Sequence, residues 1–140
     1  MTPELQDKLY NSYPKLFRQK ELSIEETCMS WGIRCDDGWY AVLECLCFLM
    51  QYSTDVTNHE QVEFIQIKEK FGSLRVYTDG HDDFQDALID FACLMSTSTC
   101  EICGSTKDVF QMSSEYVKTV CQTCFDIQFL HILMTFEKHL

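Results

Sequence analysis

The amino-acid sequence predicts an α+β fold whose last third is organised by a bound zinc ion, and three observations lead to this prediction. An apolar pattern typical of two short strands in residues 61–78 indicates a β-hairpin. Apolar residues at helical spacing in residues 39–51 and 81–96 indicate helices that pack on that hairpin. Two Cys-x2-Cys pairs then follow. We therefore expect an α+β part in residues 1–97 and a zinc ribbon with a terminal helix in residues 98–140, packed as one unit.

The first part of the chain predicts one short helix followed by irregular structure. Residues 3–17 fit a helix and a break, because Pro3 suits a first helical position and Pro14 interrupts the pattern. Residues 28–35 fit a short strand that leads into the turn Asp36-Asp37-Gly38. The aromatic residues around this turn either line a ligand-facing loop or anchor the turn to the core, and we favour the anchoring role; they are Trp31 and Trp39.

The middle of the chain predicts a buried helix and the hairpin. Residues 39–51 are apolar on more than one helical face, as in a helix that is covered on several sides. Residues 53–60 are polar and predict a loop. The hairpin consists of a strand over 61–71, a turn at Gly72-Ser73 and a second strand over 74–78.

Residues 81–96 give the clearest helical pattern in the chain. Its apolar stripe, which we expect to face the core, consists of Phe84, Ala87, Leu88, Phe91, Leu94 and Met95. Carboxylates follow a different face of this helix and form a candidate acidic partner-binding face; they are Asp79, Asp82, Asp83, Asp86 and Asp90. The same residues are also what a solvated helix face carries, and we favour that simpler interpretation. Their spacing does not match a calcium-binding loop.

Four of the nine cysteines have the spacing of metal ligands. Cys100-x2-Cys103 is followed, after seventeen residues, by Cys121-x2-Cys124. Two intervening residues let one turn aim both sulfurs at one ion, and Gly104 stands where such a turn commonly needs a positive φ. Four reduced, buried thiols are the alternative. We favour one structural Zn²⁺, since four thiolates leave no open position for water or substrate.

The chain between and after the two cysteine pairs indicates the type of zinc fold. Residues 109–112 and 116–120 predict two short strands around Ser113-Ser114, and a helix directly after the second pair is the treble-clef variant. The final helix, residues 125–140, is apolar on nearly every side. It either threads the core or docks on a second copy, as a homodimer, or on a partner, and the sequence leaves these open.

Three of the eleven cations gather on the predicted hairpin and form a candidate anion-binding patch. Lys68 and Lys70 share one strand face, and Arg75 follows on the second strand. An ion-paired solvent face is the simpler interpretation, which we favour because the chain carries a formal net charge of −11. That charge argues against nucleic-acid and membrane-surface binding and is compatible with a partner protein that has a basic surface.

Location and catalysis are constrained mainly by what the sequence lacks. No apolar run reaches the roughly 18 residues that a membrane span needs, and the polar start has no signal-peptide pattern, so we expect a cytoplasmic protein. The four histidines stand in no recognisable relation to a nucleophile or a carboxylate pair, and we find no phosphate loop, dinucleotide fingerprint or zincin helix. The sequence therefore predicts a protein that is not an enzyme.

Several segments carry a resemblance beyond composition and spacing. In chain order they are Tyr13-Pro14-Lys15-Leu16-Phe17, Asp36-Asp37-Gly38-Trp39-Tyr40, Ile67-Lys68-Glu69-Lys70-Phe71-Gly72-Ser73-Leu74-Arg75-Val76-Tyr77, Ser98-Thr99-Cys100-Glu101-Ile102-Cys103-Gly104 and Val120-Cys121. Together they resemble a family of small, uncharacterised zinc-ribbon proteins of bacteriophages and prophages that share a Lys-Glu-Lys-Phe-Gly-x-Leu-Arg motif. Such proteins often end near a Cys-x2-His pair, whereas here Cys124 stands at the position of that histidine, and the apolar tail after it is an addition.

The resemblance implies a phage accessory protein in the bacterial host cytoplasm. Such small acidic proteins often act against host machinery, so our leading hypothesis is a non-catalytic inhibitor of a host-defence complex that binds a basic protein surface, in the manner of an anti-CRISPR protein. A nucleic-acid or transcription-associated zinc-ribbon module is the first alternative. An unrecognised hydrolase is the second.

Overall fold

The protein has an α+β fold with four α-helices and two small antiparallel sheets in the part of the chain that the computed structural model describes, residues 1–113 and 117–137. The α+β prediction is thus confirmed. In chain order the elements are α1 (Pro3–Ser12), the 3₁₀ turns η1 (Arg18–Glu21), η2 (Cys28–Trp31) and η3 (Asp37–Trp39), α2 (Tyr40–Thr57), β1 (Glu63–Lys70), β2 (Ser73–Asp79), α3 (Asp83–Ser96), β3 (Val109–Gln111), β4 (Thr119–Cys121) and α4 (Gln122–Glu137).

The β1–β2 hairpin is the centre of the larger part. Its turn is Phe71-Gly72, one position before the predicted Gly72-Ser73, and both residues have positive φ (53° and 76°), as in the tight turns that match strand twist. Ile67 pairs with Val76, and both are buried on one face. The next pair along the hairpin, Lys68 and Arg75, points to the other face, because side chains alternate along a strand.

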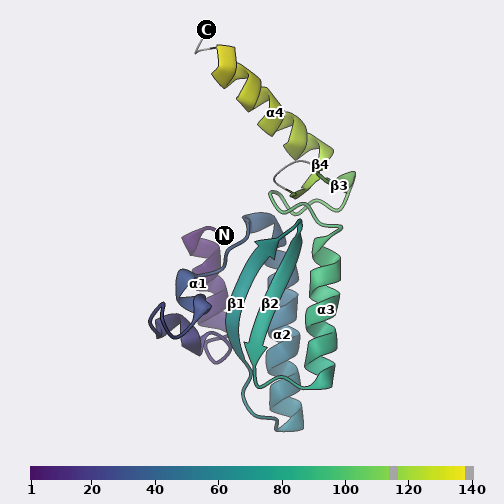
Figure 1. Cartoon of the computed structure of the whole chain (residues 1–140). Coiled ribbons are helices and arrows are strands. Elements are labelled where there is room, and N and C mark those ends of the chain that lie inside the picture. Colours follow the sequence, from purple (N-terminus) through teal and green to yellow (C-terminus); the bar gives the residue numbers. More distant parts are fainter. Residues whose placement is uncertain (114–116, 138–140) are drawn as a thin grey trace.

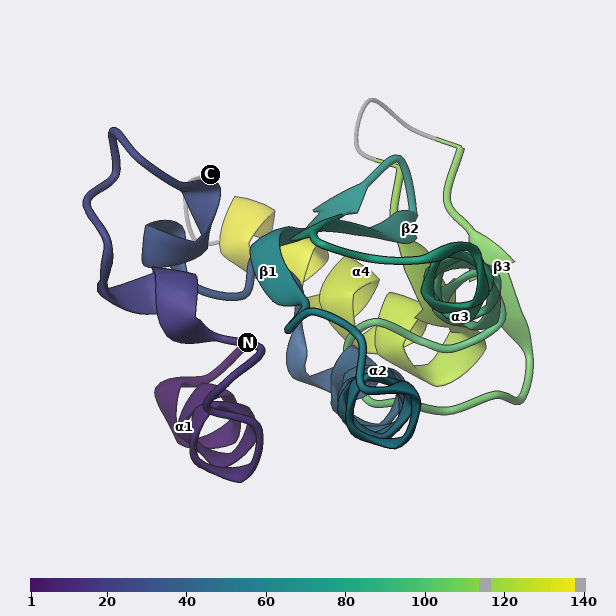
Figure 2. The same ribbon diagram turned by 90° about the horizontal axis from the view of Figure 1, so that it is seen from below.

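Helices α2 and α3 lie side by side on that buried face of the hairpin (Figure 1). Seen from below, α1 and the first 3₁₀ turns lie beside β1, on the other side from α3 (Figure 2). The core between these layers contains Trp39, which is fully buried, and the apolar side chains Leu9, Phe17, Met29, Ile33, Leu43, Met50, Phe64, Ile67 and Leu74.

Two predictions for the first third of the chain are wrong. The first helix ends at Ser12, before Pro14, rather than reaching residue 17. Residues 28–35 form the 3₁₀ turn η2 and a single bridge instead of a strand. The Thr27 hydroxyl accepts a hydrogen bond from the Met29 amide and so begins the turn. Only Arg34 then pairs, in parallel, with Lys68.

Helix α2 continues through the residues that were predicted as a loop from residue 53. The polar side chains that suggested a loop bond within the helix: Thr54 and Thr57 donate to the carbonyl oxygens of Met50 and Ser53, at 2.9 Å and 2.7 Å. The helix ends at Thr57, before Asn58 in the left-handed conformation.

Helix α3 begins two residues after the predicted start and ends at the predicted residue, Ser96, but it buries a different face. Asp82 caps it and forms a capping box with Gln85. The residues that face the sheet and α2 are Gln85, Ile89, Ala92 and Ser96. Gln85 is fully buried because its amide donates to the Thr54 hydroxyl at 3.0 Å. Most of the predicted core stripe lies on the outer side, with Phe84, Phe91 and Leu94 each at least 60% exposed, whereas Leu88 packs partly against the core.

Helix α4 starts directly after β4 and leads away from the other helices (Figure 1). Its described side chains Ile127 and Leu130 are 61% and 57% exposed, so this part of it does not thread the core. Residues 138–140 of the predicted terminal helix lie outside the described residues, and the homodimer remains a prediction. Within the described residues, none of the helices is both long and apolar enough to cross a membrane.

Candidate metal centre

The first cysteine pair lies on a tight turn that hydrogen bonds hold closed. The Gly104 amide donates to the Cys100 carbonyl oxygen at 2.9 Å, and the Cys100 amide donates to the Ser105 carbonyl oxygen at 2.8 Å. Gly104 has a φ of +80°, as its position after the cysteine pair predicts. The turn therefore directs Cys100 and Cys103 to the same side.

The second pair is carried by the junction of β4 and α4. Cys121 ends β4, and Cys124 lies in the first turn of α4. Strand β3 pairs antiparallel with β4, in the register Phe110 to Val120, and brings this junction next to the first turn. Both strands are shorter than predicted, and the predicted start of the second strand at residue 116 lies outside the described residues.

The four cysteine sulfurs lie within 4.8 Å of one another. The Cys103 and Cys121 sulfurs are 3.7 Å apart, which is too far for a disulfide bond. Sulfurs at about 2.3 Å from one tetrahedral ion are separated by about 3.8 Å, so the Cys103–Cys121 distance is compatible with two ligands of one such ion. The predicted ligand set is thus assembled in space, and it could hold one metal ion.

Hydrogen bonds from backbone amides to the cysteine sulfurs stabilise the negatively charged thiolate form of this cluster. Burial raises the pKa of the Cys100 thiol, but backbone amides, including those of Cys103 and Cys121, outweigh it and lower the pKa to about 7. The Cys124 amide lies 3.5 Å from the Cys121 sulfur. Burial and the neighbouring thiols raise the pKa of Cys124, because several thiolates so close together repel one another without a cation. A divalent cation removes that repulsion.

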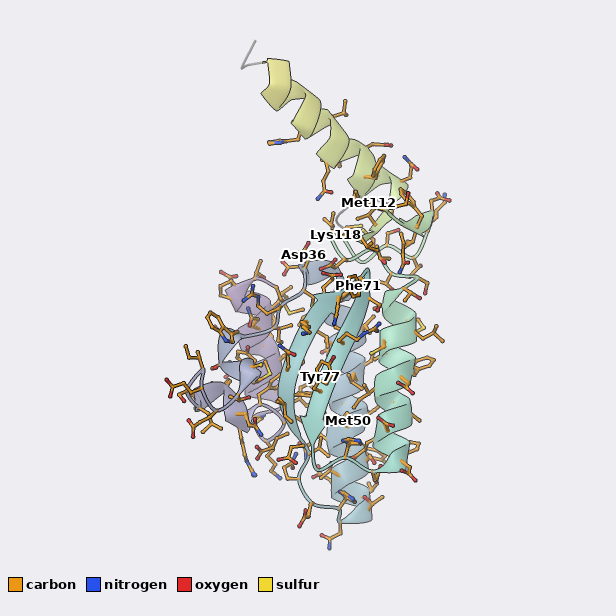
Figure 3. All side chains as sticks on the ribbon, viewed as in Figure 1. Asp36, Met50, Phe71, Tyr77, Met112 and Lys118 are labelled. Carbon is orange, nitrogen blue, oxygen red and sulfur yellow. The ribbon has the colours of Figure 1, made fainter. Side chains whose placement is uncertain are left out.

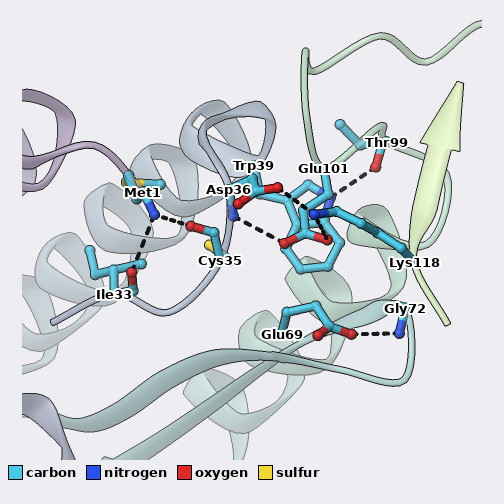
Figure 4. Close-up of polar contacts among 10 residues, drawn as sticks. All are labelled: Met1, Ile33, Cys35, Asp36, Trp39, Glu69, Gly72, Thr99, Glu101 and Lys118. Carbon is cyan, nitrogen blue, oxygen red and sulfur yellow. Dashed lines mark hydrogen bonds and ion pairs between the residues drawn. The ribbon is translucent and has the colours of Figure 1, made fainter. Parts of the chain in front are cut away.

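The first cysteine turn is anchored to the start of α2. The Gly38 amide donates to the Glu101 carbonyl oxygen at 2.7 Å, and the fully buried Trp39 indole donates to the Thr99 carbonyl oxygen at 2.8 Å (Figure 4). The sequence left two roles open for the aromatic residues of this turn, lining a ligand site or anchoring the turn to the core. For Trp39 these contacts confirm the anchoring role. Trp31 behaves differently, since it is 58% exposed.

A buried carboxylate lies inside this contact. Glu101 is 3% exposed, and its carboxylate accepts a hydrogen bond from the Asp36 amide at 3.0 Å. Lys118 is ion-paired with Asp36 and lies 3.8 Å from the second Glu101 oxygen, which has no hydrogen-bond partner among the described residues (Figure 4). Burial raises the pKa of Glu101, although the Asp36 amide partly offsets it.

Comparison of the chain with protein-family models, curated proteins and solved structures gave no match. The resemblance to phage proteins therefore remains an expectation from the sequence motifs. Any function proposed for the chain rests on the arrangement of its own residues.

The predicted anion patch forms one surface. Lys68 lies directly opposite Arg75 across the hairpin, and Lys70 follows on the same strand face. Arg34 joins them, because it pairs with Lys68 on the other side. The sequence does not indicate Arg34, since it lies more than thirty residues from Lys68 in the chain, in an irregular segment after η2.

The candidate acidic face is divided between several roles. Asp82 caps α3 by accepting from the Gln85 amide, so its carboxylate is already used. Asp86 lies 3.8 Å from the His81 ring. The other three carboxylates, on Asp79, Asp83 and Asp90, are exposed. The five residues thus form no uniform surface, which agrees with the interpretation of a solvated helix face.

An apolar groove between α2 and α3 is the feature that sequence reasoning missed. It encloses about 590 Å³ and is lined mainly by residues of these two helices. The walls include Cys45, Leu49, Leu88, Phe91 and Met95. The signal was present in the stripe of residues 84–95, but periodicity alone does not tell whether a stripe faces the core or solvent.

Proposed function

We propose that this chain is a non-catalytic, zinc-stabilised binding protein whose groove between α2 and α3 takes up the apolar face of a helix from a partner protein. The observation that carries the proposal is the groove itself, which joins two exposed apolar stripes. On α2 the stripe consists of Cys45, Phe48, Leu49, Tyr52 and Val56, and on α3 it consists of the exposed Phe84, Phe91 and Met95 with the half-buried Leu88 between them.

The spacing of these stripes suits a helix as the occupant. Residues 45, 49, 52 and 56 on α2 and residues 84, 88, 91 and 95 on α3 both follow the i, i+4, i+7, i+11 pattern of one helix face. Two neighbouring helices with outward apolar stripes form the kind of groove into which a third helix packs. Exposed apolar surface of this size on a small domain is costly in water unless it is covered.

The electrostatics of the groove indicate which kind of helix it accepts. Asp37 is the charged side chain among the described residues of its wall, and Cys103 lies at the same end. Four thiolates around one Zn²⁺ carry a net charge of −2, so this end of the groove is anionic. The chain as a whole has a formal charge of −11. We therefore expect a helix with an apolar face and basic flanking residues, which agrees with a partner that has a basic surface.

The metal in this proposal is a structural Zn²⁺ held by Cys100, Cys103, Cys121 and Cys124 in a treble-clef-like ribbon. Four sulfur ligands favour zinc among the common divalent ions, and a full set of four leaves no position for a reacting water. The ion fixes two distant turns to each other. Since the first turn is bonded to Gly38 and Trp39, the ion also stabilises the end of the groove.

A photocrosslinking experiment in living cells tests this function directly. Benzoylphenylalanine is placed at Phe91, in the groove, and in a control protein at Ile24, which is similarly exposed (60% and 61%) but distant from the groove. We expect a discrete crosslinked protein from position 91 alone, and its loss when Leu49→Glu is added. Equal products from both positions, or none from position 91, would contradict the proposal.

The same experiment separates the candidate partners. A crosslinked product of twice the mass of the chain identifies a second copy, which the exposed Ile127 and Leu130 of α4 would favour as occupant. A product of different mass, digested and sequenced, identifies a heterologous partner. A component of a host-defence complex is the partner that the resemblance to phage proteins leads us to expect.

A further inference from the structure

We propose that the outer face of the β1–β2 hairpin, with the adjoining turn η2, binds single-stranded nucleic acid. We call this surface the cationic face and define it by Arg34, Lys68, Lys70 and Arg75. It lies on the opposite side of the hairpin from α2, and no other ribbon crosses in front of it (Figure 1). The inference is independent of the groove, which is lined mainly by residues of α2 and α3.

The strand pairing concentrates these four cations. Arg34 pairs with Lys68 at the edge of β1, and Lys68 in turn lies opposite Arg75 on β2. Neighbouring strands are about 4.8 Å apart, so three cations stand in a row across the sheet within about 10 Å. Lys70 continues the face along β1. Four of the chain's eleven cations thus share one small surface in a protein of net charge −11.

These charges are not neutralised within the protein. Among the described residues, none of the four cations has a carboxylate oxygen within 4.0 Å, whereas Arg18, Lys20 and Lys118 each have one. Glu69, the acid between the two lysines, also lines the depression beside Arg34 and Lys68, but its carboxylate is bonded to the hairpin turn. Its carboxylate accepts a hydrogen bond from the Gly72 amide at 2.8 Å. Arg75 donates to the Leu74 carbonyl oxygen and lies in a depression with Asp86 and Asp90, near the acidic helix as the simpler interpretation expects. Arg34, Lys68 and Lys70 are the cations that an external anion can reach.

Exposed aromatic rings border the same face. Trp31 is 58% exposed and, with Arg34 and Lys68, lines a shallow depression of about 500 Å³. Tyr77, 46% exposed, lies opposite Gln66, and the Lys68 ammonium is 5.8 Å from the centre of its ring. Phe71 at the hairpin turn is 70% exposed (Figure 3). Rings of this kind provide stacking platforms for unpaired bases.

The carboxylates near this face restrict the path of the ligand. Asp86 and Asp90 border a second depression on the α3 side, which Arg75 also lines. A phosphate is repelled there. The path that avoids these acids runs from Trp31 across Arg34 and Lys68 to Lys70, at the β1 side of the sheet. It has room for about three or four phosphates, one for each cation of the face.

The combination of groups favours single-stranded nucleic acid over other anions. An acidic peptide would use the cations but not the rings, while duplex DNA would present phosphates without accessible base faces. The duplex would also bring its dense charge close to a strongly acidic protein, where repulsion outside the face opposes binding. A single strand is flexible enough to contact the face alone. An arginine beside an exposed tryptophan can contact a phosphate while the tryptophan ring stacks on the neighbouring base.

Fluorescence anisotropy with a labelled ten-residue oligothymidylate at 25 mM NaCl tests the inference on the zinc-loaded protein. We expect saturable binding that weakens with salt, with a slope of log K against log[NaCl] of about −2 to −3, as three or four phosphate contacts predict. Arg34→Gln combined with Lys68→Gln should weaken binding at least tenfold. Trp31→Ala should weaken it about tenfold through lost stacking.

Matched controls make each outcome decisive. Lys8→Gln combined with Lys15→Gln removes the same charge from exposed positions in α1 and after it, and should leave the affinity within about twofold. The groove variant Leu49→Glu should also bind normally, which keeps this test separate from that of the proposed function. Circular dichroism verifies that each variant is folded.

Three results would overturn the inference. The first is no saturable binding of the oligonucleotide at 25 mM NaCl. The second is equal weakening by the α1 control pair, which would show a non-specific charge effect. The third is binding of a labelled deca-glutamate or of an abasic oligonucleotide as tight as that of oligothymidylate, which would assign the face to anions in general rather than to a nucleic acid with bases.

Discussion

Gly38 lies so close to the carbonyl oxygen of Cys100 that a β-carbon on Gly38 would be 2.2 Å from that oxygen. No side chain fits at this distance, and the nearby atoms belong to backbone that cannot move aside. The Gly38 amide also donates to the Glu101 carbonyl oxygen. The turn before α2 and the first cysteine turn are therefore fitted to each other atom by atom, 62 residues apart in the sequence.

Gly38→Ala should accordingly separate the cysteine segment from the core. We expect a loss of about 2–3 kcal/mol in the free energy of unfolding, as for an overpacked core position, and weaker zinc binding. Urea denaturation and competition with a chromophoric zinc chelator measure the two effects. Gly80→Ala is the control, since Gly80 has a φ of +83° but lies far along the chain from the cysteines. It should lower stability and leave zinc affinity unchanged; equal effects of both variants on zinc affinity would refute the coupling.

The exposure of the α3 stripe gives a second prediction. Ile89, 7% exposed, faces the sheet, so Ile89→Ala should cost about 2–4 kcal/mol of folding free energy. Phe91 is a larger residue, yet it is 60% exposed, and Phe91→Ala should cost less than about 1 kcal/mol. Denaturation midpoints of the two variants provide the comparison. A larger loss at Phe91 than at Ile89 would mean that α3 buries the other face.

Glu101 gives a prediction about pH. Because burial raises its pKa above the ordinary 4.5, its ionised form opposes folding. Below pH 4.5 the Glu101 carboxyl is protonated in both the folded and the unfolded protein, and the folded state keeps its full stability. As the pH rises through the raised pKa, the buried group ionises and that part of the folding free energy is lost. Glu101→Gln keeps an oxygen for the Asp36 amide and removes the charge. The melting temperature of the variant, relative to the natural protein, should therefore increase from pH 4.5 to 7.5.

An exposed acid provides the control for this experiment. Glu60→Gln removes one carboxylate from an exposed position and measures the effect of losing a surface charge alone. If the Glu101→Gln difference decreases with rising pH, the ion pair with Lys118 outweighs burial, and the electrostatic description of this contact is wrong.

Zinc binding should release protons. With the pKa of Cys100 near 7 and that of Cys124 raised, most of the four thiols are protonated at pH 7 before the ion binds, so loading should release about three protons. Calorimetric titration in two buffers of different ionisation enthalpy counts them. The affinity should rise from pH 6 to pH 8. Release of fewer than two protons would be inconsistent with four thiolate ligands.

The hairpin and the cysteine cluster could be predicted from the sequence because their signals are local. Strand alternation sets the faces of residues 63–79, and each cysteine pair needs only one turn to bring its sulfurs together. Gly104 illustrates the point, since its positive φ follows from its place after Cys103. The presence of Lys68 and Arg75 on one face follows in the same way.

The features that could not be predicted depend on contacts distant in the sequence. Gln85 is polar, but it is buried because Thr54 of another helix accepts its hydrogen bond, so α3 turns its apolar stripe outward. The same contact involves the polar end of α2, which was predicted as a loop. Arg34 reaches the cationic face through one bridge to Lys68, and nothing in the sequence near Arg34 indicates that pairing.

X-ray absorption at the zinc edge of the purified protein tests the four-cysteine metal centre most directly. One zinc ion per chain, surrounded by four sulfur atoms at about 2.3 Å, is the predicted result. The signal should change to three sulfurs and one lighter atom, or disappear, in the Cys121→Ser variant. A protein that folds fully without stoichiometric metal, or a zinc ion with nitrogen or oxygen ligands in the natural chain, would contradict the four-cysteine centre.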